Sequence, residues 1–216
     1  WIRNTIGDAI ETWERFARRL PADQLQLFHA RFTLGDRLRI EDDIIGRFGP
    51  ASTSTERTGR LVIATQVIEQ SLDVDFDLLV SDLAPIDRLI QRAGRLQRHT
   101  RDEHGDRTSG ADGRGGARMV VFGPEWTETP AADWYRSCLR RASYVCSRPG
   151  HVWHSARVLQ VGSWTMPDDG RRLIESVFGE TADDDLPDTL HREALRVEGQ
   201  QWAAINQAQA NRLNLL

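Results

Sequence analysis

The sequence has no lysine, because all 28 of its basic residues are arginine. A phosphate-binding loop of the Gly-x-x-x-x-Gly-Lys-Ser/Thr type needs that lysine to reach the β- and γ-phosphates, so no such loop is present. No Asp-Glu-x-His or Asp-Glu-x-Asp sequence follows an apolar strand either. We therefore expect that this chain alone does not hold and hydrolyse a nucleotide in the usual way.

Cysteine and long apolar runs are also scarce. The two cysteines, Cys138 and Cys146, lie eight positions apart without paired spacing, which argues against a disulfide framework and a zinc site. His151 and His154 lie beside Trp153, and we interpret them as packing residues and predict no metal site. With no secretory signal and no apolar run of about 18 residues, the sequence predicts a cytoplasmic protein without a membrane partner.

Charge is unevenly distributed along the chain. The net charge of -4 argues against coating of nucleic acid by bulk attraction, yet the segment 88–101 holds five arginines and no acidic residue. If residues 86–98 form one helix, Gln91, Arg95 and Arg98 share a face of it. Guanidinium groups offer planar donors that suit a phosphoryl group in transfer. A solvated helix face and a site for nucleic-acid phosphates are the alternative interpretations.

Apolar strands alternate with helical patterns in the first part of the chain. Strands are predicted at 25–29, 61–65, 78–81 and 119–122, and a helix is predicted from Ile6 to Leu20. Residues 1–3 are interpreted as the tail of a strand whose start precedes them, with Asn4 as a helix cap. The alternation predicts an α/β fold with a parallel sheet. Ligands gather at the carboxyl ends of such strands, where His29, Thr65 and Asp82 fall.

Two domains are predicted, residues 1–123 and residues 124–216. The stretch from about 100 to 117 is rich in Gly, Asp, Arg and Ser and is interpreted as a flexible surface loop. After Pro124 the pattern is mainly helical, with helices predicted near 131–146, 171–178 and 190–212. We interpret that region as an accessory domain.

Two stretches resemble helicase motifs. Residues 91–98, Gln-Arg-Ala-Gly-Arg-Leu-Gln-Arg, resemble motif VI of superfamily 2 helicases, and residues 64–73 resemble their motif V. The longer stretch 64–77, followed by 81–87, resembles the CRISPR-associated helicase-nuclease of type I systems. Residues 3–5, 28–32 and 36–37 are similar to that family's motif IV region, and residues 171–179 are similar to part of its C-terminal domain. The resemblance implies a second RecA-like domain with flanking helices, followed by a smaller, mainly helical C-terminal domain.

The resemblance also implies roles for individual residues. Arg95 and Arg98, with Gln91 beside them, face the terminal phosphates of a nucleotide, and Asp73 contacts the ribose or motif VI. The residues implied to contact single-stranded DNA are Asn4, Thr5, Arg31, Arg37, Thr65 and Gln66. Asn4 and Thr5 stand where a helix begins, so plain capping is their alternative role. Arg37 has the alternative of pairing with Asp36, Glu41 or Asp42 on its own helix.

The implied function is the C-terminal motor half of an ATP-dependent single-stranded DNA translocase in type I CRISPR interference. ATP with Mg²⁺ would be held mainly by a first RecA-like domain that carries the phosphate-binding loop. The implied partners are that domain, an HD-type nuclease domain, single-stranded DNA and the RNA-guided surveillance complex (Cascade). Two alternatives stay open: the motor domain of another superfamily 2 helicase, such as an RNA remodeller, or a docking module without catalysis. Residues 81–87 favour the CRISPR family.

Overall fold

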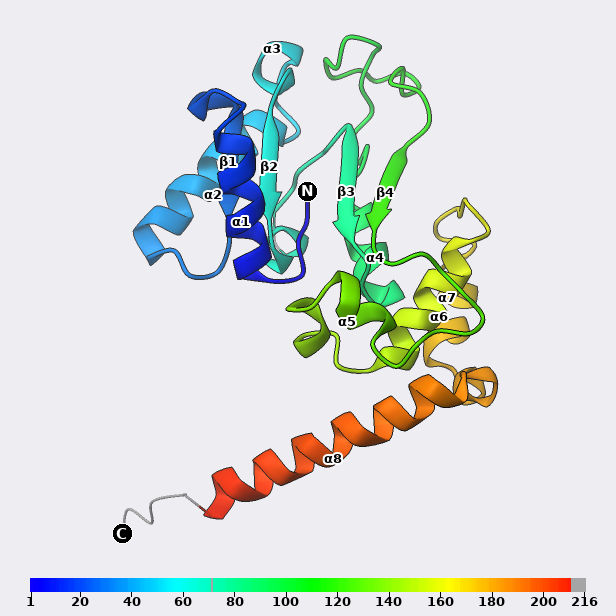
Figure 1. Cartoon of the computed structure of the whole chain (residues 1–216). Coiled ribbons are helices and arrows are strands. Elements are labelled where there is room, and N and C mark those ends of the chain that lie inside the picture. Colours follow the sequence, from blue (N-terminus) through cyan, green and yellow to red (C-terminus); the bar gives the residue numbers. More distant parts are fainter. Residues whose placement is uncertain (71, 211–216) are drawn as a thin grey trace. The chain divides into compact units, whose positions relative to one another are not determined.

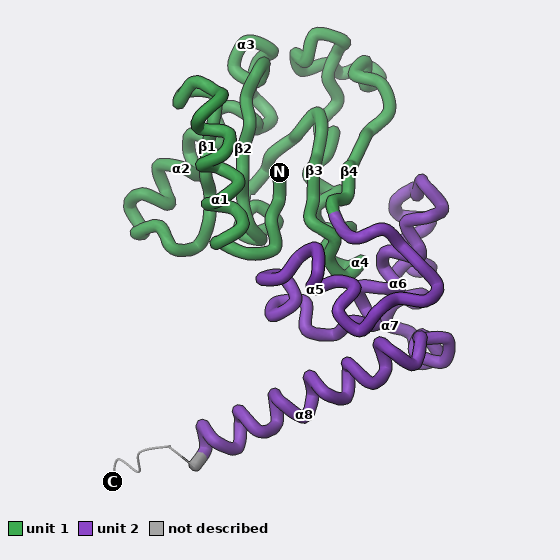
Figure 2. The backbone as a smooth tube through the Cα atoms, viewed as in Figure 1, with its two compact units in different colours: residues 1–122 green, residues 123–216 purple. Residues whose placement is uncertain are grey.

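The computed structural model describes residues 1–70 and 72–210 (Figure 1). The chain divides into two compact units, Trp1–Phe122 and Gly123–Leu216 (Figure 2). In the part of the chain that the structure describes, no helix is both long and apolar enough to span a membrane.

Unit 1 alternates strands and helices. Its strands are β1 (Leu25–Phe28), β2 (Leu61–Ala64), β3 (Leu78–Asp82) and β4 (Arg118–Phe122). Its helices are α1 (Ile6–Ala17), α2 (Leu34–Phe48), α3 (Ser54–Arg57) and α4 (Ile86–Ala93), with 3-10 turns η1 (Ala22–Gln24) and η2 (Gln66–Glu69). β1 pairs with β2 and β3 pairs with β4, both in parallel. The predicted α/β fold with parallel strands and flanking helices is confirmed.

The first residues of the chain join the two strand pairs. Ile2 forms parallel bridges to Ala64 at the end of β2 and to Ser81 in β3. The Ile2 amide donates to the carbonyl of Val80 at 2.8 Å, and the Asp82 amide donates to the carbonyl of Ile2 at 3.0 Å. Ile2 therefore has strand-like pairing on both sides, and the carboxyl ends of β2 and β3 lie on either side of it.

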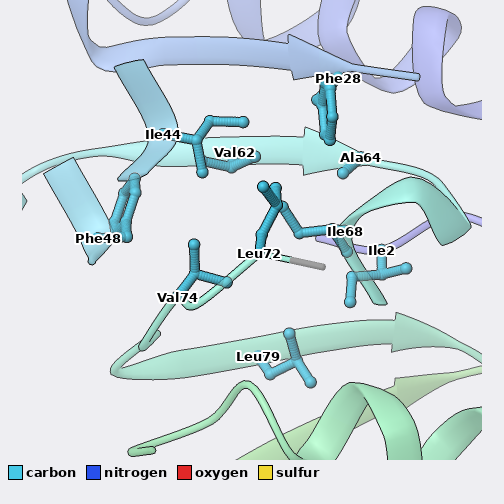
Figure 3. Close-up of a cluster of buried hydrophobic side chains, with 10 residues drawn as sticks. All are labelled: Ile2, Phe28, Ile44, Phe48, Val62, Ala64, Ile68, Leu72, Val74 and Leu79. Carbon is cyan, nitrogen blue, oxygen red and sulfur yellow. The ribbon is translucent and has the colours of Figure 1, made fainter. Parts of the chain in front are cut away.

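The main core of unit 1 lies between these strands, α2 and the segment after β2 (Figure 3). Its buried members are Ile2, Phe28, Ile44, Phe48, Val62, Ala64, Ile68, Leu72, Val74 and Leu79. Burying a large apolar side chain contributes roughly 1.5–3 kcal/mol, so this cluster is the main stabiliser of the unit. In the stretch 72–77 apolar and acidic residues alternate, and Leu72 and Val74 are core members. The alternation leaves the carboxylates of Asp73, Asp75 and Asp77 for polar partners.

α1 covers the smaller apolar cluster on β1 and β2. Ala9 is fully buried there with Leu25 and Ile63. Thr5, rather than Asn4, is the N-cap of α1, because the Thr5 hydroxyl accepts a hydrogen bond from the Asp8 amide at 3.1 Å. Asn4 is only 2% exposed and takes part in the interior.

Unit 2 is mainly helical, as predicted. It contains α5 (Trp134–Cys138), α6 (Pro149–Leu159), α7 (Gly170–Phe178) and α8 (Asp188–Ala210), with 3-10 turns η3 (Ala142–Tyr144) and η4 (Ala182–Asp185). The helix predicted over 131–146 is thus reduced to α5 and a turn, and α6 was not predicted. α6 packs against α5, α7 and α8, and His154 on it is fully buried. The predicted end of the last helix at Arg212 lies outside the described residues.

Candidate functional site

α4 ends earlier than the sequence predicts. It stops at Ala93, and Gly94 is its C-cap, with its amide bonded to the carbonyl of Ile90. The backbone then pairs with Phe76, whose amide donates to Arg95 and whose carbonyl accepts from Gln97. The prediction that Gln91, Arg95 and Arg98 share one helix face is therefore wrong. Gln91 is exposed on the last turn of α4, and the two arginines lie in the turns after it.

The five arginines of segment 88–101 divide by burial. Arg92 and Arg101 are 1% and 0% exposed, whereas Arg88, Arg95 and Arg98 reach the surface to different extents. Arg92 donates from Nε to Glu69 Oε1 at 2.7 Å and from Nη1 to Ser81 Oγ at 2.8 Å. A guanidinium so enclosed is structural, because no incoming ligand reaches it.

Glu69, at the end of η2, is the partner of three of these arginines. Its carboxylate is buried and also accepts from Arg88 Nη1 at 3.1 Å. Its backbone carbonyl accepts from Arg95 Nη2 at 2.8 Å. Glu69 and Arg92 were not among the site residues predicted from the sequence. The burial of Arg92 could have been predicted from its position three residues after Leu89, next to the apolar stripe of α4.

Arg95 and Arg98 are only partly neutralised. Arg95 has no carboxylate partner in the described part of the chain, and its buried Nε finds no hydrogen-bond acceptor there. Burial, followed by the nearby charge of Arg98, lowers the pKa of Arg95. Arg98 Nε pairs at 3.0 Å with Asp73 Oδ1, an oxygen that His99 Nε2 also approaches at 2.9 Å. Such guanidiniums are suited to bind an incoming anion.

We call this set the α4 cluster; it comprises Glu69, Asp73, Arg88, Arg92, Arg95 and Arg98. The contact between Asp73 and Arg98 brings together two of the four residues that the resemblance implied at the nucleotide. The Asp73 side chain is half-exposed, so this ion pair lies at the surface of the unit. The α4 cluster therefore combines an enclosed half around Glu69 with an accessible half around Asp73.

A second group of predicted residues lies at the carboxyl ends of the strands. The Asn4 amide donates to Asp82 Oδ2 at 3.0 Å, and Asn4 Nδ2 donates to the carbonyl of Leu83 at 2.8 Å. Gln66 Nε2 donates to the carbonyl of Asn4 at 2.9 Å. Thr65 is 2% exposed, and its amide donates to the carbonyl of Phe28. These bonds hold the ends of β1, β2 and β3 together at one edge.

Asp82 is the buried charge at that edge. Burial raises the pKa of its carboxyl group, and the guanidinium of Arg3 opposes the shift. Arg3 Nε donates to Asp82 Oδ2 at 3.0 Å. Asp82 therefore anchors the first residues of the chain to the end of β3.

The remaining predicted nucleic-acid residues lie on surface segments. Arg31 is exposed after β1, and its amide donates to His29 Nδ1. Arg37 pairs with Glu41 Oε1 at 2.8 Å, which is one of the partners considered on its own helix. The Thr5 hydroxyl caps α1. The roles of these residues toward DNA stay predictions.

The loop after α4 carries a separate network, which we call the loop cluster; it comprises Arg57, Asp75, Asp77, Arg101, Asp112 and Arg114. Arg101 Nε donates to Asp75 Oδ2 at 2.6 Å, and its Nη atoms donate to the carbonyls of Ser52 and Gly49. Arg114 bonds to the carboxylates of Asp75, Asp77 and Asp112. The segment 100–117 has no helix or strand, yet Arg101 and Arg114 anchor it to the core. Arg101 thus belongs to the interior and not to an anion site.

Comparison with known proteins identifies related sequences. Residues 1–101 match the family described as CRISPR-associated nuclease/helicase Cas3, C-terminal. The CRISPR-associated endonuclease/helicase Cas3 of Escherichia coli (strain K12) is 53% identical over 77 residues, covering 36% of this chain and 8% of that protein. The Cas3 nuclease/helicase of Streptococcus thermophilus is 43% identical over 98 residues, covering 45% and 10%. The chain thus spans a tenth or less of the length of these two relatives.

Solved structures extend the likeness over nearly the whole chain. The crystal structure of T. fusca Cas3 matches with a TM-score of 0.72 and 30% identity, covering 97% of this chain and 22% of that one. T. fusca Cas3-ATP matches at 0.70 with 29% identity, covering 97% and 22%. A chain in a structure described as a CRISPR RNA-guided surveillance complex, pre-nicking, matches at 0.68 with 30% identity, covering 97% and 24%. The resemblance indicated by the sequence is confirmed.

Proposed function

We propose that this chain, which is similar to the C-terminal region of Cas3 nuclease/helicases, supplies the second motor half of an ATP-dependent single-stranded DNA translocase. The observation that carries this proposal is the accessible half of the α4 cluster. There Arg98 pairs with the carboxylate of Asp73, whereas Arg95 bonds only to a neutral carbonyl among the described residues. The two guanidiniums together therefore keep a net positive charge. An anion with several oxygens is the ligand that such a pair of guanidiniums binds best.

The proposed chemistry is stabilisation of a phosphoryl group in transfer. ATP with Mg²⁺ is held mainly by a separate domain that carries the phosphate-binding loop, and this chain adds Arg95 and Arg98 as arginine fingers, with Gln91 beside them. Arginine fingers stabilise the charge on the equatorial oxygens of the transition state and raise kcat about 10³- to 10⁵-fold. Asp73 orients Arg98 through their ion pair and lies within reach of the same ligand.

Single-stranded DNA is proposed to run along the edge where the strands end. Thr65 and Gln66 stand at the start of η2 on that edge, and Arg31 is exposed after β1. Thr5 and Arg37 complete the proposed surface of the track, while the buried Asn4 and Thr65, each 2% exposed, support it from inside. Contacts of this kind go to the sugar-phosphate backbone, so we expect no base-sequence preference.

The proposed partners follow from the family. The Cas3 relatives are named nuclease/helicases, and one similar chain lies in a surveillance complex. We propose that this region acts with a first RecA-like domain and an HD-type nuclease domain, and that Cascade recruits the whole to DNA. A cytoplasmic location remains the expectation from the sequence.

The test measures ATP hydrolysis by this chain combined with the domain that bears the phosphate-binding loop, with and without single-stranded DNA. We expect DNA-stimulated hydrolysis only in the combination, and a loss of about 10³-fold or more in Arg98→Ala. Arg15→Ala is the matched control, because Arg15 is an exposed arginine that pairs with Glu11 on α1. If the two parts bind each other but hydrolyse nothing, the chain is a docking module. Stimulation by RNA alone would point instead to an RNA remodeller.

A further inference from the structure

Glu69 lies where the turn η2 meets the helix α4. Its side chain is fully buried, and its two carboxylate oxygens bind different arginines of α4: Oε1 accepts from Arg92 at 2.7 Å and Oε2 accepts from Arg88 at 3.1 Å. A buried carboxylate is tolerated only when it is paired, because removing the charge from water is expensive. The ion pairs therefore bind η2 to two successive turns of α4.

The other end of η2 belongs to the proposed DNA track. Thr65 is the N-cap of this four-residue turn, and Gln66 is its first residue. Because η2 is so short, a displacement of Gln66 on DNA binding is expected to shift Glu69 as well. No flexible segment separates the two residues.

Glu69 also contacts Arg95 directly. Arg95 Nη2 donates to the Glu69 carbonyl at 2.8 Å, and this is its contact with the η2 turn. The position of the Arg95 guanidinium therefore depends on where the Glu69 backbone lies. Asp73 holds Arg98 less firmly than Glu69 holds its arginines. The Asp73–Arg98 pair is half-exposed, and exposed pairs contribute only about 0–1 kcal/mol.

We propose that Glu69 is a positioning residue that couples DNA binding at Gln66 to the placement of Arg95. This inference rests on the proposed function. The Glu69 carboxylate is fully buried and paired with Arg88 and Arg92, so it is not open to a ligand. Glu69 transmits the position of one end of η2 to α4 through its carboxylate and to Arg95 through its carbonyl.

The test replaces Glu69 by Gln in the intact enzyme. Gln keeps the size of the side chain but removes its charge and turns an N-H group toward a guanidinium. We expect the DNA-stimulated kcat to fall about tenfold per folded molecule, while the KM for ATP and the half-saturating DNA concentration change less than about twofold. Glu11→Gln is the matched control, because Glu11 pairs with Arg15 on the exposed face of α1.

Two further variants keep the test informative if Glu69→Gln folds poorly. Arg88→Gln removes only the half-exposed partner, and we expect it to lower kcat severalfold without loss of folded protein. Arg92→Gln combined with Glu69→Gln should lower kcat no further than either change alone, because the two residues act as one unit. Additive losses would overturn the inference.

The outcomes separate this inference from the proposed function. A kcat that falls only in proportion to the unfolded fraction overturns the positioning role, and so does a loss of DNA affinity at unchanged kcat. If Arg98→Ala abolishes hydrolysis and Glu69→Gln does not alter kcat, only the positioning role fails. If neither variant changes kcat, the proposed function fails too.

Discussion

Both arginine clusters take carboxylate partners from residues 69–77, but they differ in charge balance. The α4 cluster sets four guanidiniums against two carboxylates, those of Glu69 and Asp73. The loop cluster sets three guanidiniums against three carboxylates, those of Asp75, Asp77 and Asp112. The balanced cluster satisfies itself, and the unbalanced one has positive charge left for a ligand. Charge balance, rather than arginine content, therefore separates a cluster that neutralises itself from one that can accept an anion.

Burial differs between the accessible half of the α4 cluster and the centre of the loop cluster, although Glu69 and Arg92 are buried in the first cluster and Asp77 is 49% exposed in the second. Arg101 and Asp75 are fully buried, and Arg114 is nearly so. In the α4 cluster the side chains of Arg98 and Asp73 are 44% and 50% exposed. Substitutions in the loop cluster should therefore affect stability first, and those around Asp73 should affect activity first.

The largest expected effect on stability comes from Arg101→Ala. It leaves the buried carboxylate of Asp75 with fewer partners and removes the guanidinium donor from the carbonyls of Ser52 and Gly49. The Gly49 carbonyl keeps its bonds from the Ser52 amide and hydroxyl. Breaking a buried ion pair in this way costs about 3–5 kcal/mol. We expect the free energy of unfolding in urea to fall by that amount. A loss below about 1 kcal/mol, as for an exposed pair, would remove the distinction between the clusters.

Arg114→Gln should have an intermediate effect. Arg114 binds all three carboxylates of the loop cluster, but Asp75 keeps Arg101 and Asp77 keeps Arg57 when it is removed. Hydrogen bonds to charged groups contribute about 1.5–3 kcal/mol, and we expect a loss of that size in the same urea experiment. Arg47→Gln is the control, since Arg47 pairs with Asp43 on the surface of α2. Equal losses for both variants would show that the loop cluster is no more than a surface network.

Sequence patterns predicted the elements of unit 1 well because those patterns are local. The predicted strands at 25–29, 61–65, 78–81 and 119–122 differ from the observed ones by one residue at one end. Runs of apolar residues bounded by polar ones carry that information themselves. The missed helix α6 begins with Pro149 and Gly150, a pair that is typical of loops, although Pro is well suited to the first turn of a helix.

The partners of individual arginines could not be predicted, because they lie far apart in the sequence. Arg101 meets Asp75 across 26 positions, and its surroundings have the composition of a solvent-exposed loop. The helix considered over 86–98 ran through Gly94, which is instead the C-cap of α4, and the pairing of the following turn with Phe76 is a tertiary contact. Sequence reasoning therefore identified Arg95 and Arg98 as candidates and missed Glu69, which holds the helix before them.

Acid should weaken the loop cluster. The hydrogen bond from Arg114 lowers the pKa of Asp112 from 3.8 to about 2. Burial alone would raise the pKa of Asp77, but hydrogen bonds from Arg114 and Arg57 outweigh it and hold that pKa below its usual value. A carboxylate whose pKa is depressed in the folded state stabilises it above the unfolded pKa and loses that contribution as the pH falls.

The expected pH window is therefore from about 4 down to about 2. Urea midpoints measured across this range should fall more steeply for the native chain than for Arg114→Gln, which has already lost the bonds in question. Parallel curves for the two proteins would contradict the assignment of these carboxylates to Arg114.

The smallest expected effect on stability is that of Asp73→Asn. The pair with Arg98 is half-exposed, so its loss should cost about 0–1 kcal/mol in urea unfolding. The same change removes one of the two carboxylates of the α4 cluster and increases its surplus of positive charge. If that surplus serves a nucleotide, Asp73→Asn should leave the fold intact and alter kcat and the KM for ATP, because Arg98 loses its orienting partner. A fall in stability as large as that of Arg101→Ala, without a change in hydrolysis, would show that both clusters are structural.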